Sequence, residues 1–267
     1  MKKGIWILGI LVLILVIIVG ALLFMLFTPS GFKQSLISTS TAPVADSYSV
    51  VTIKGDEASS TYSYEITSAY PQIIGLSNTD AQVKINTAIN AVVKKEIDGF
   101  RADYAQNTEM GVFAENGTST ADITFQKEDS VPGVISLALN EYFYSAGAAH
   151  PGANVIALNY ATSTGKAVTL STLFTGNYLK LISQKSIELL TKQLGEAADK
   201  ENIADGAGVK ADNYQVYFPT PSGLKIIFTE YQVAGYAAGQ QEVLIPYSDL
   251  KSVINPSGPL KSYLALN

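Results

Sequence analysis

The chain of 267 residues contains no cysteine, one histidine (His150), one arginine (Arg101) and one tryptophan. Without cysteine it forms no disulfide and has no thiol nucleophile, and a single histidine leaves few of the ligands that structural zinc prefers. The presence of only one arginine argues against a nucleic-acid partner, because arginine side chains supply much of base and phosphate recognition. We therefore expect no metal site, no cofactor and no nucleic-acid partner.

One long apolar run follows the N-terminal lysines. Residues 4–27 read GIWILGILVLILVIIVGALLFMLF and contain no charged residue. A helix of about 24 residues reaches about 36 Å, which is enough to cross the ~30 Å hydrocarbon core of a bilayer. No A-x-A-like cleavage site follows Phe27, so we expect a retained single-pass transmembrane helix in the cell membrane. Lys2 and Lys3 place the N-terminus in the cytoplasm and the chain after Thr28 outside.

The part of the chain after this anchor is acidic and begins with a polar segment. Residues 28–47, TPSGFKQSLISTSTAPVADS, are rich in Ser, Thr and Pro and predict a flexible stalk. Without Lys2 and Lys3, 16 basic residues face 23 acidic ones, a net charge of about −7. Such a charge suits an ectodomain with a cationic partner. We expect two modules, at residues 48–130 and 131–260, with one continuous domain as the alternative.

The spacing of apolar residues predicts an α+β fold. Apolar residues recur at three and four positions over residues 77–104 and 177–194, which predicts two helices, and Pro246 begins a short helix that ends at Val253. Runs rich in β-branched and aromatic residues predict strands at residues 48–54, 61–70, 121–128, 134–145, 154–160, 166–170, 213–218, 224–230 and 242–245. This order predicts antiparallel sheets with helices packed on one face.

Several segments resemble a known family in their order and spacing. They are YPQI at 70–73 ahead of the first helix, YSAGAAHP at 144–151, the segment 159–174, YQVAGYAAG at 231–239 and VLIPYSDL at 243–250. Together they resemble the extracytoplasmic region shared by RsiV-type anti-sigma factors, which sense lysozyme, and PdaC-type peptidoglycan deacetylases. The resemblance implies a cell-envelope binding or sensor domain whose ligand is a lysozyme-like protein or a wall glycan. We expect neither sigma-factor binding nor deacetylation, because no counterpart of the segments that perform them is found in these residues.

The candidate binding residues lie mostly in these segments. His150 occupies a Gly-Ala-Ala-His-Pro loop, and without a second histidine or a cysteine we expect it to form structural hydrogen bonds rather than to transfer protons or bind metal. Tyrosine rings with a polar tip suit protein interfaces and sugar faces alike, and sheet packing is the alternative explanation. The candidate tyrosines are Tyr142, Tyr144, Tyr160, Tyr231 and Tyr236.

Two glutamates are the acidic candidates. Glu141 lies two residues after Leu139, and Glu230 lies two residues after Phe228, so in a strand each glutamate points to the same face as that apolar residue. Both glutamates are therefore placed at the edge of the core. A pair of carboxyl groups with raised pKa values is the arrangement that glycoside hydrolysis uses. Strand ends also carry such residues where a face reaches solvent. We therefore assign no catalytic residue and keep an envelope enzyme that acts on glycan through carboxylates as the alternative function.

The predicted topology is tested by protease added to intact spheroplasts. We expect the region after Thr28 to be digested and the protein to stay in the membrane during carbonate extraction, because residues 4–27 span the bilayer. Release by carbonate, or protection from external protease, would contradict the prediction.

Overall fold

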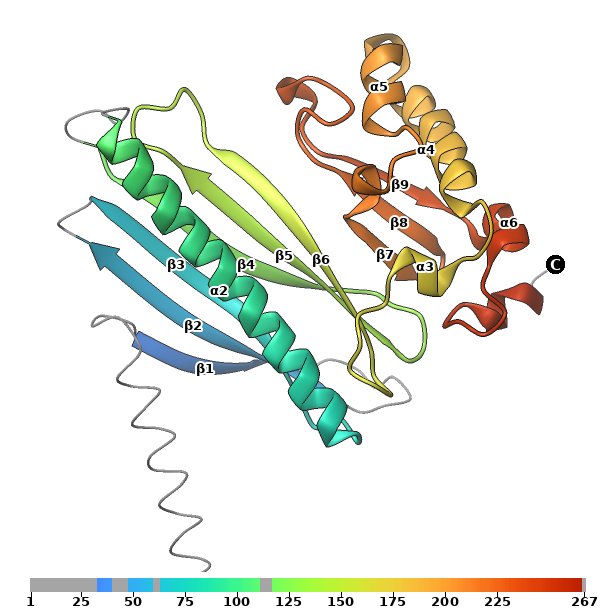
Figure 1. Ribbon diagram of the computed structural model, residues 1–267, viewed down its shortest axis with the longest axis horizontal. Helices are drawn as coiled ribbons and strands as arrows, with labels where there is room; N and C mark the ends of the chain where they lie inside the picture. Colours follow the sequence, from blue (N-terminus) through green and yellow to red (C-terminus); the bar gives the residue numbers. More distant parts are fainter. Residues whose placement is uncertain (1–32, 40–47, 60–62, 111–116, 266–267) are drawn as a thin grey trace, which may run out of the picture.

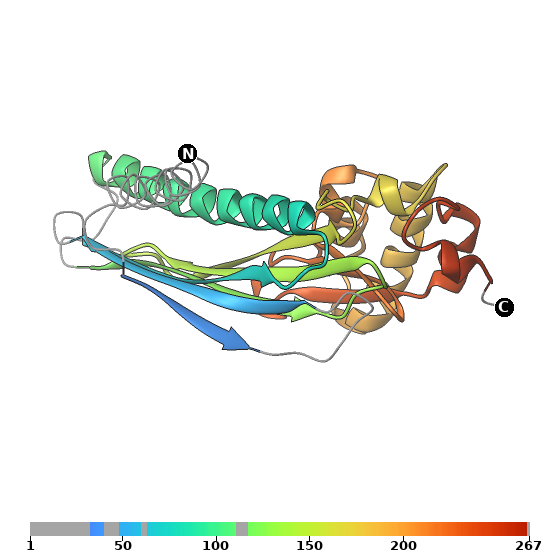
Figure 2. The same ribbon diagram turned by 90° about the horizontal axis from the view of Figure 1, so that it is seen from below.

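The large sheet of the protein is built from the first six strands (Figure 1). A computed structural model describes residues 33–39, 48–59, 63–110 and 117–265. The strand order follows the sequence: β1 (Lys33–Thr39), β2 (Ser49–Ser59), β3 (Tyr64–Ile74), β4 (Ser119–Glu128), β5 (Val134–Tyr144) and β6 (Gly152–Ala161). The long helix α2 (Thr79–Glu109) connects β3 to β4 and lies along one face of this sheet (Figure 2).

The α+β class is confirmed, but the large sheet is mixed rather than wholly antiparallel. β3 and β4 run parallel, with Tyr64 opposite Ser119, while the other neighbours in this sheet are antiparallel. A parallel pair needs a connection that returns the chain to the starting end of the sheet, and a helix usually supplies it. α2 is this connection. The prediction of an antiparallel sheet was wrong here because strand periodicity does not report the direction of a neighbour.

The apolar stripe of α2 packs on the sheet. Asn78 accepts a hydrogen bond from the backbone N–H of Ala81 at 3.0 Å and so caps the helix start. The buried residues of the helix then recur every four positions: Ala81, Ile85, Ile89, Val93 and Ile97. They face buried residues of β3 to β6: Ile66, Ile73, Ile123, Leu137 and Leu158. Each fully buried isoleucine stabilises the fold by about 1.5–3 kcal/mol.

The second half of the described chain forms a smaller, separate layer. Its antiparallel sheet contains β7 (Tyr217–Thr220), β8 (Gly223–Phe228) and β9 (Gln241–Ile245). Helix α4 (Tyr178–Leu194) packs Ile182 and Leu190 into the same core as Ile226 and Val243. The remaining helices are α3 (Leu170–Leu173), α5 (Lys200–Gly206), α6 (Tyr247–Leu250), and the 3-10 turns at Gly195–Ala197, Ala211–Tyr214, Tyr236–Ala238, Lys251–Val253 and Lys261–Ala265.

The two layers meet at β5, β6 and β7. Ala138 and Val155, on the sheet face opposite α2, form a small core with Phe218. Beside it, Ser136 Oγ donates to Asn159 Oδ1 at 2.7 Å, and Asn159 Nδ2 donates to the backbone oxygen of Tyr217 at 2.8 Å. Lys225 of β8 forms an ion pair with Glu128 of β4. Apolar contact, a hydrogen-bonded chain and an ion pair therefore join the two layers.

Some predicted segments differ from the structure. Lys33–Thr39, inside the predicted stalk, forms β1 instead, because the edge of β2 offers unpaired backbone groups to a strand of almost any composition. The strand predicted at residues 166–170 is wrong: only an isolated bridge joins Tyr160 to Ala167 before α3 begins. The strand predicted at residues 213–218 begins only at Tyr217, after a 3-10 turn, and α5 was not predicted.

The predicted module boundary near Ser130 falls between two strands of one sheet. β4 and β5 pair from Thr120 to Glu128, and the sheet continues to Ala161. The division into modules at residues 48–130 and 131–260 stays a prediction.

Among the described residues, no helix combines the length and the apolar character that spanning a bilayer requires. The predicted anchor, residues 4–27, lies outside the described residues.

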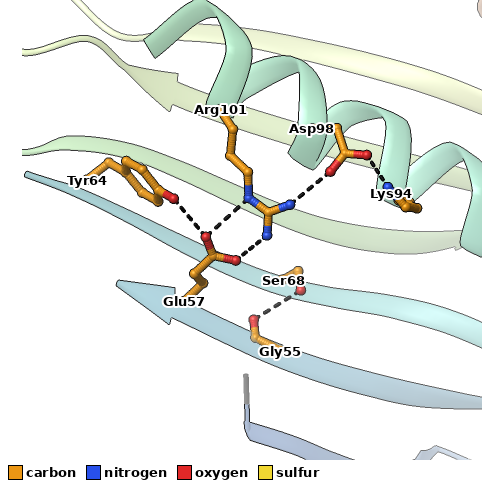
Figure 3. A network of polar contacts seen from close by, with 7 residues as sticks. All are labelled: Gly55, Glu57, Tyr64, Ser68, Lys94, Asp98 and Arg101. Atoms are coloured by element: carbon orange, nitrogen blue, oxygen red, sulfur yellow. Dashed lines mark hydrogen bonds and ion pairs between the residues drawn. The ribbon is translucent and has the colours of Figure 1, made fainter. Parts of the chain in front are cut away.

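A polar network joins α2 to β2 and β3 (Figure 3). The guanidinium of Arg101, the only arginine, donates from Nε to Glu57 Oε1 at 3.1 Å and pairs through Nη2 with Glu57 Oε2. Tyr64 donates to Glu57 Oε1 at 2.8 Å, and Arg101 Nη1 donates to Asp98 Oδ1 at 2.8 Å. Burial disfavours the charged form of Glu57, but the hydrogen bonds and the charge of Arg101 outweigh it, so the pKa of Glu57 is lowered.

We expect Glu57→Gln to destabilise the protein by about 1–2 kcal/mol at neutral pH, because a charge-assisted pair is replaced by a weaker neutral contact. A lowered folded-state pKa contributes stability above the unfolded-state value, and this stability is lost as pH falls through the folded-state value. The difference in the free energy of unfolding should therefore shrink below about pH 4. Urea unfolding from pH 7 to pH 3 measures it, with exposed Glu65→Gln as control. If the difference in the free energy of unfolding is as large at pH 3 as at pH 7, the ion pair of Glu57 with Arg101 is not its cause.

Candidate functional site

Two neighbouring cavities lie beside α2, and the larger of the two lies beside the C-terminal half of this helix. It has a volume of about 720 Å³ and is lined by α2, β4, β5, β6 and the two residues that follow β8. Five carboxylates line it: Glu96, Asp103, Asp122, Glu141 and Glu230. Aromatic side chains complete the lining: Phe100, Tyr104, Tyr142 and Phe143. The described residues place no lysine or arginine in this lining, so the cavity favours a ligand with positive charge.

Glu141 is the most perturbed carboxyl group of this cavity. Its Oε2 accepts a hydrogen bond from Asn154 Nδ2 at 3.1 Å, while its buried Oε1 has no hydrogen-bond partner among the described residues. Burial raises the pKa of Glu141, and the carboxylate of Glu96 raises it further, against the lowering effects of Asn154 and Lys95. Glu230 lines the same cavity, so the structure brings the two acidic candidates of the sequence together.

Three candidate rings form a second feature, which we call the His150 cluster: His150, Tyr231 and Tyr236. The rings of His150 and Tyr236 stack with centroids 4.1 Å apart and an interplanar angle of 25°. The Tyr231 centroid lies 5.5 Å from that of Tyr236, and its hydroxyl oxygen lies 3.4 Å from His150 Nε2. Tyr231 is 62% exposed and has a φ of 65°, a left-handed conformation that is unusual for a tyrosine. The cluster therefore presents aromatic rings to solvent.

The remaining candidate tyrosines lie in different surroundings. Tyr142 is 54% exposed and lines the larger cavity. Tyr144 is half-buried and lies opposite Thr120 in the pairing of β5 with β4. Tyr160 is only 6% exposed and packs in the core beneath α2, where burial raises its pKa. Tyr160 therefore does not share a surface with the His150 cluster.

Sequence reasoning missed the residues that α2 and β4 contribute to the cavity. Glu96 and Asp103 are seven positions apart, a spacing that puts two side chains on the same side of a helix, and this was the available signal. Asp122 carries no such signal, because its place depends on the parallel pairing of β3 and β4. The side chain of Phe143 points to the same face of β5 as that of Leu139 but is 45% exposed, because α2 does not cover this end of β5.

A smaller cavity of about 490 Å³ adjoins the larger one. It is lined by four consecutive residues of β6, Asn154 to Ala157, by three residues of α2, and by seven residues of the smaller layer: Asp212, Asn213, Gln215, Val216, Ile227, Thr229 and Gln232. Both cavities include Glu96, Asn154 and Thr229, so together they form one groove along β6. The described residues contain no group of three or more His, Asp or Glu side chains arranged for a metal ion.

The architecture is that of an α+β pair: a mixed sheet covered by one long helix, joined to a small three-stranded sheet with its own helices. Residues 57–153 match the family model "Deacetylase PdaC", and residues 171–248 match the model "Protein of unknown function (DUF3298)". Each match covers about a third of the chain, the first over the large sheet and the second over the smaller layer. The predicted resemblance to the PdaC-type proteins is thereby confirmed, and the two matches indicate a domain pair related to the cell envelope.

Curated relatives match parts of the chain. Peptidoglycan-N-acetylmuramic acid deacetylase PdaC of Bacillus subtilis is 22% identical over 173 residues, which are 64% of this chain and 36% of PdaC. The immunogenic proteins MPB64 of Mycobacterium bovis and MPT64 of Mycobacterium tuberculosis are 28% identical over 133 residues, 49% of this chain and 57% of theirs. The chain thus spans about a third of PdaC and little more than half of the mycobacterial proteins.

Two crystal structures share the fold. A DUF3298-family protein of Bacteroides fragilis superimposes with a TM-score of 0.57 at 15% identity, covering 90% of this chain and all of that one. A DUF3298-family protein of Pseudomonas aeruginosa gives a TM-score of 0.50 at 13% identity, covering 85% of this chain and 94% of that one. At these identities the likeness shows the arrangement of helices and strands alone.

We expect Glu141→Gln to stabilise the protein at neutral pH by up to about 1 kcal/mol, because it removes a charge from a buried carboxyl group with one unsatisfied oxygen. A raised folded-state pKa gives stability below the unfolded-state value and loses it as pH rises through the folded-state value. The advantage of the variant should therefore be absent near pH 4 and grow toward pH 7. Thermal unfolding across this range measures it, beside exposed Glu196→Gln as control. A variant less stable than the native protein at pH 7 would show that ionisation of Glu141 costs the folded protein little free energy.

Proposed function

We propose that the chain is a membrane-anchored extracytoplasmic binding or sensor domain for a cell-envelope ligand, either a lysozyme-like protein or a wall glycan. The observation that carries the proposal is the exposed His150 cluster. Aromatic rings are normally buried in a core, and here Tyr231 is 62% exposed with its ring beside two others. Rings with polar tips at a surface suit contact with a protein or with the flat face of a sugar.

Two further observations support an envelope ligand. The B. subtilis relative is named for an action on peptidoglycan, and the PdaC match of this chain runs from the end of β2 to the start of β6 and includes His150. The apolar run at residues 4–27 would fix the domain at the membrane, where such ligands are met. For a lysozyme-like partner, the negative charge of about −7 outside the membrane would attract a strongly cationic protein.

An envelope enzyme acting on glycan is the second candidate. Glu141 and Glu230 line one cavity, and the pKa of Glu141 is raised, which is the property expected of a general acid. An enzyme of this kind would consume glycan without forming a stable complex. Saturable binding without turnover therefore favours the binding domain.

The test measures binding of lysozyme and of purified wall polymer to the full-length protein in detergent. We expect Tyr231→Ala and Tyr236→Ala each to weaken binding about tenfold or more, the effect of losing an aromatic anchor at an interface. Val83→Ala is the matched control, because Val83 is also 62% exposed but lies on α2 away from the cluster. Equal binding by all variants would remove the His150 cluster from the site. Turnover of the polymer would favour the enzyme.

If lysozyme is the ligand, its association rate should depend on salt. Attraction between an acidic domain and a cationic protein acts over ~30 Å at 0.01 M ionic strength but only ~8 Å at 0.15 M. We expect association to slow markedly across this range while dissociation changes little, because aromatic contacts survive salt. Surface plasmon resonance measures both rates. No binding at low salt would exclude lysozyme.

A further inference from the structure

The groove along β6 has the form of a site for an extended ligand. Its two cavities, of about 720 and 490 Å³, share Glu96, Asn154 and Thr229. α2 contributes Val92, Lys95 and Glu96 to the smaller cavity, and the smaller layer contributes seven residues between Asp212 and Gln232. α2 and the smaller layer lie on either side of β6 (Figure 1). Cavities of about 300–1,000 Å³ accommodate ligands of drug size, so the joined groove has room for several sugar rings and is larger than one inserted side chain needs.

The charge of the groove selects the ligand further. Six carboxylates line it: Glu96, Asp103, Asp122, Glu141, Asp212 and Glu230. Lys95 also lines it, and its ammonium group lies 2.9 Å from Glu96, so these two charges cancel and five carboxylates remain. Because both walls of a narrow groove carry the same charge, the field inside favours a ligand with positive charge. A neutral glycan would gain nothing from this field, and an acidic polymer would be repelled.

The groove also offers contacts for the body of a sugar. Tyr142 and Phe143 are 54% and 45% exposed and line it, and aromatic rings can contact an ammonium ion or the C–H groups of a sugar. β6 is the last strand in the order of the large sheet, and residues 154–157 line the groove. The outer edge of such a strand carries backbone N–H and C=O groups that hydroxyl groups of a sugar can satisfy.

We infer that this groove binds a glycan that carries free amino groups, with the ammonium ions placed among the carboxylates and the sugar faces on Tyr142 and Phe143. The inference rests on the proposed function and specifies the ligand and a second surface for it. It needs no metal and no chemical step. The His150 cluster, formed by the rings of His150, Tyr231 and Tyr236, is not required for it.

The experiment compares two sugars that differ in N-acetylation and therefore in charge. Isothermal titration calorimetry of the full-length protein in detergent is carried out with the tetramer of glucosamine and with the tetramer of N-acetylglucosamine, at pH 6, where the amines are charged. We expect saturable binding of the glucosamine tetramer, at least tenfold tighter than that of its acetylated partner. Tetralysine, a cationic peptide of similar length, is the third ligand and should bind at least tenfold more weakly.

Variants locate the binding. Asp103→Asn with Glu230→Gln removes two groove charges from side chains for which no structural contact is described, so folding should be unaffected. We expect at least tenfold weaker binding of the glucosamine tetramer. Glu196→Gln with Glu201→Gln removes the same charge from exposed residues outside the groove and should leave the affinity unchanged.

Three results would overturn the inference: equal affinity for both tetramers, equal loss in the two double variants, or tetralysine binding as tightly as the glucosamine tetramer. The first excludes recognition of the amine, the second excludes the groove, and the third identifies a site for cationic peptides. Binding of lysozyme or wall polymer by a protein with no affinity for the glucosamine tetramer would overturn this inference and leave the proposed function standing.

Discussion

The packing of α2 on the large sheet is the constraint on which the other features depend. The helix returns the chain across the sheet so that β4 can pair parallel to β3, and its buried stripe from Ala81 to Ile97 covers the middle strands. Arg101 and Glu57 then fix the distal half of the helix against β2. The larger cavity lies beside this half, so its position depends on an apolar stripe and one ion pair.

The groove exists because the large sheet and the smaller layer meet along β6. The smaller layer contacts the large sheet through Phe218 and the chain Ser136–Asn159–Tyr217, on the face opposite α2. β6 therefore lies between α2 and the smaller layer, and its residues 154–157 line the smaller cavity although Val155 is buried against Phe218. The acidic lining comes from elements that are far apart in sequence, which explains why it has little signature in any one segment.

Sequence patterns predicted most elements but few of their relations. The apolar spacing over residues 77–104 and the run of strand-forming residues at 134–145 are local signals, and the helix and the strand they predicted were both confirmed. The direction of β4 and the pairing of β1 depend on which backbone edge is free nearby, which no side chain reports. The same limit applied to the site: Glu141, Tyr142 and Glu230 were named from the sequence, whereas Asp122 and Phe143 required the assembled sheet.

The pairing of β1 changes how far the domain can reach. With the proposed anchor ending at Phe27, only residues 28–32 separate it from the first residue of β1, Lys33. Even fully extended, a linker of this length allows about 20 Å, whereas a free segment through residue 47 would allow about 70 Å. The pairing of β1 would therefore keep the large sheet close to the lipid headgroups of the membrane. Ligands would then be captured in the layer of the envelope closest to the membrane.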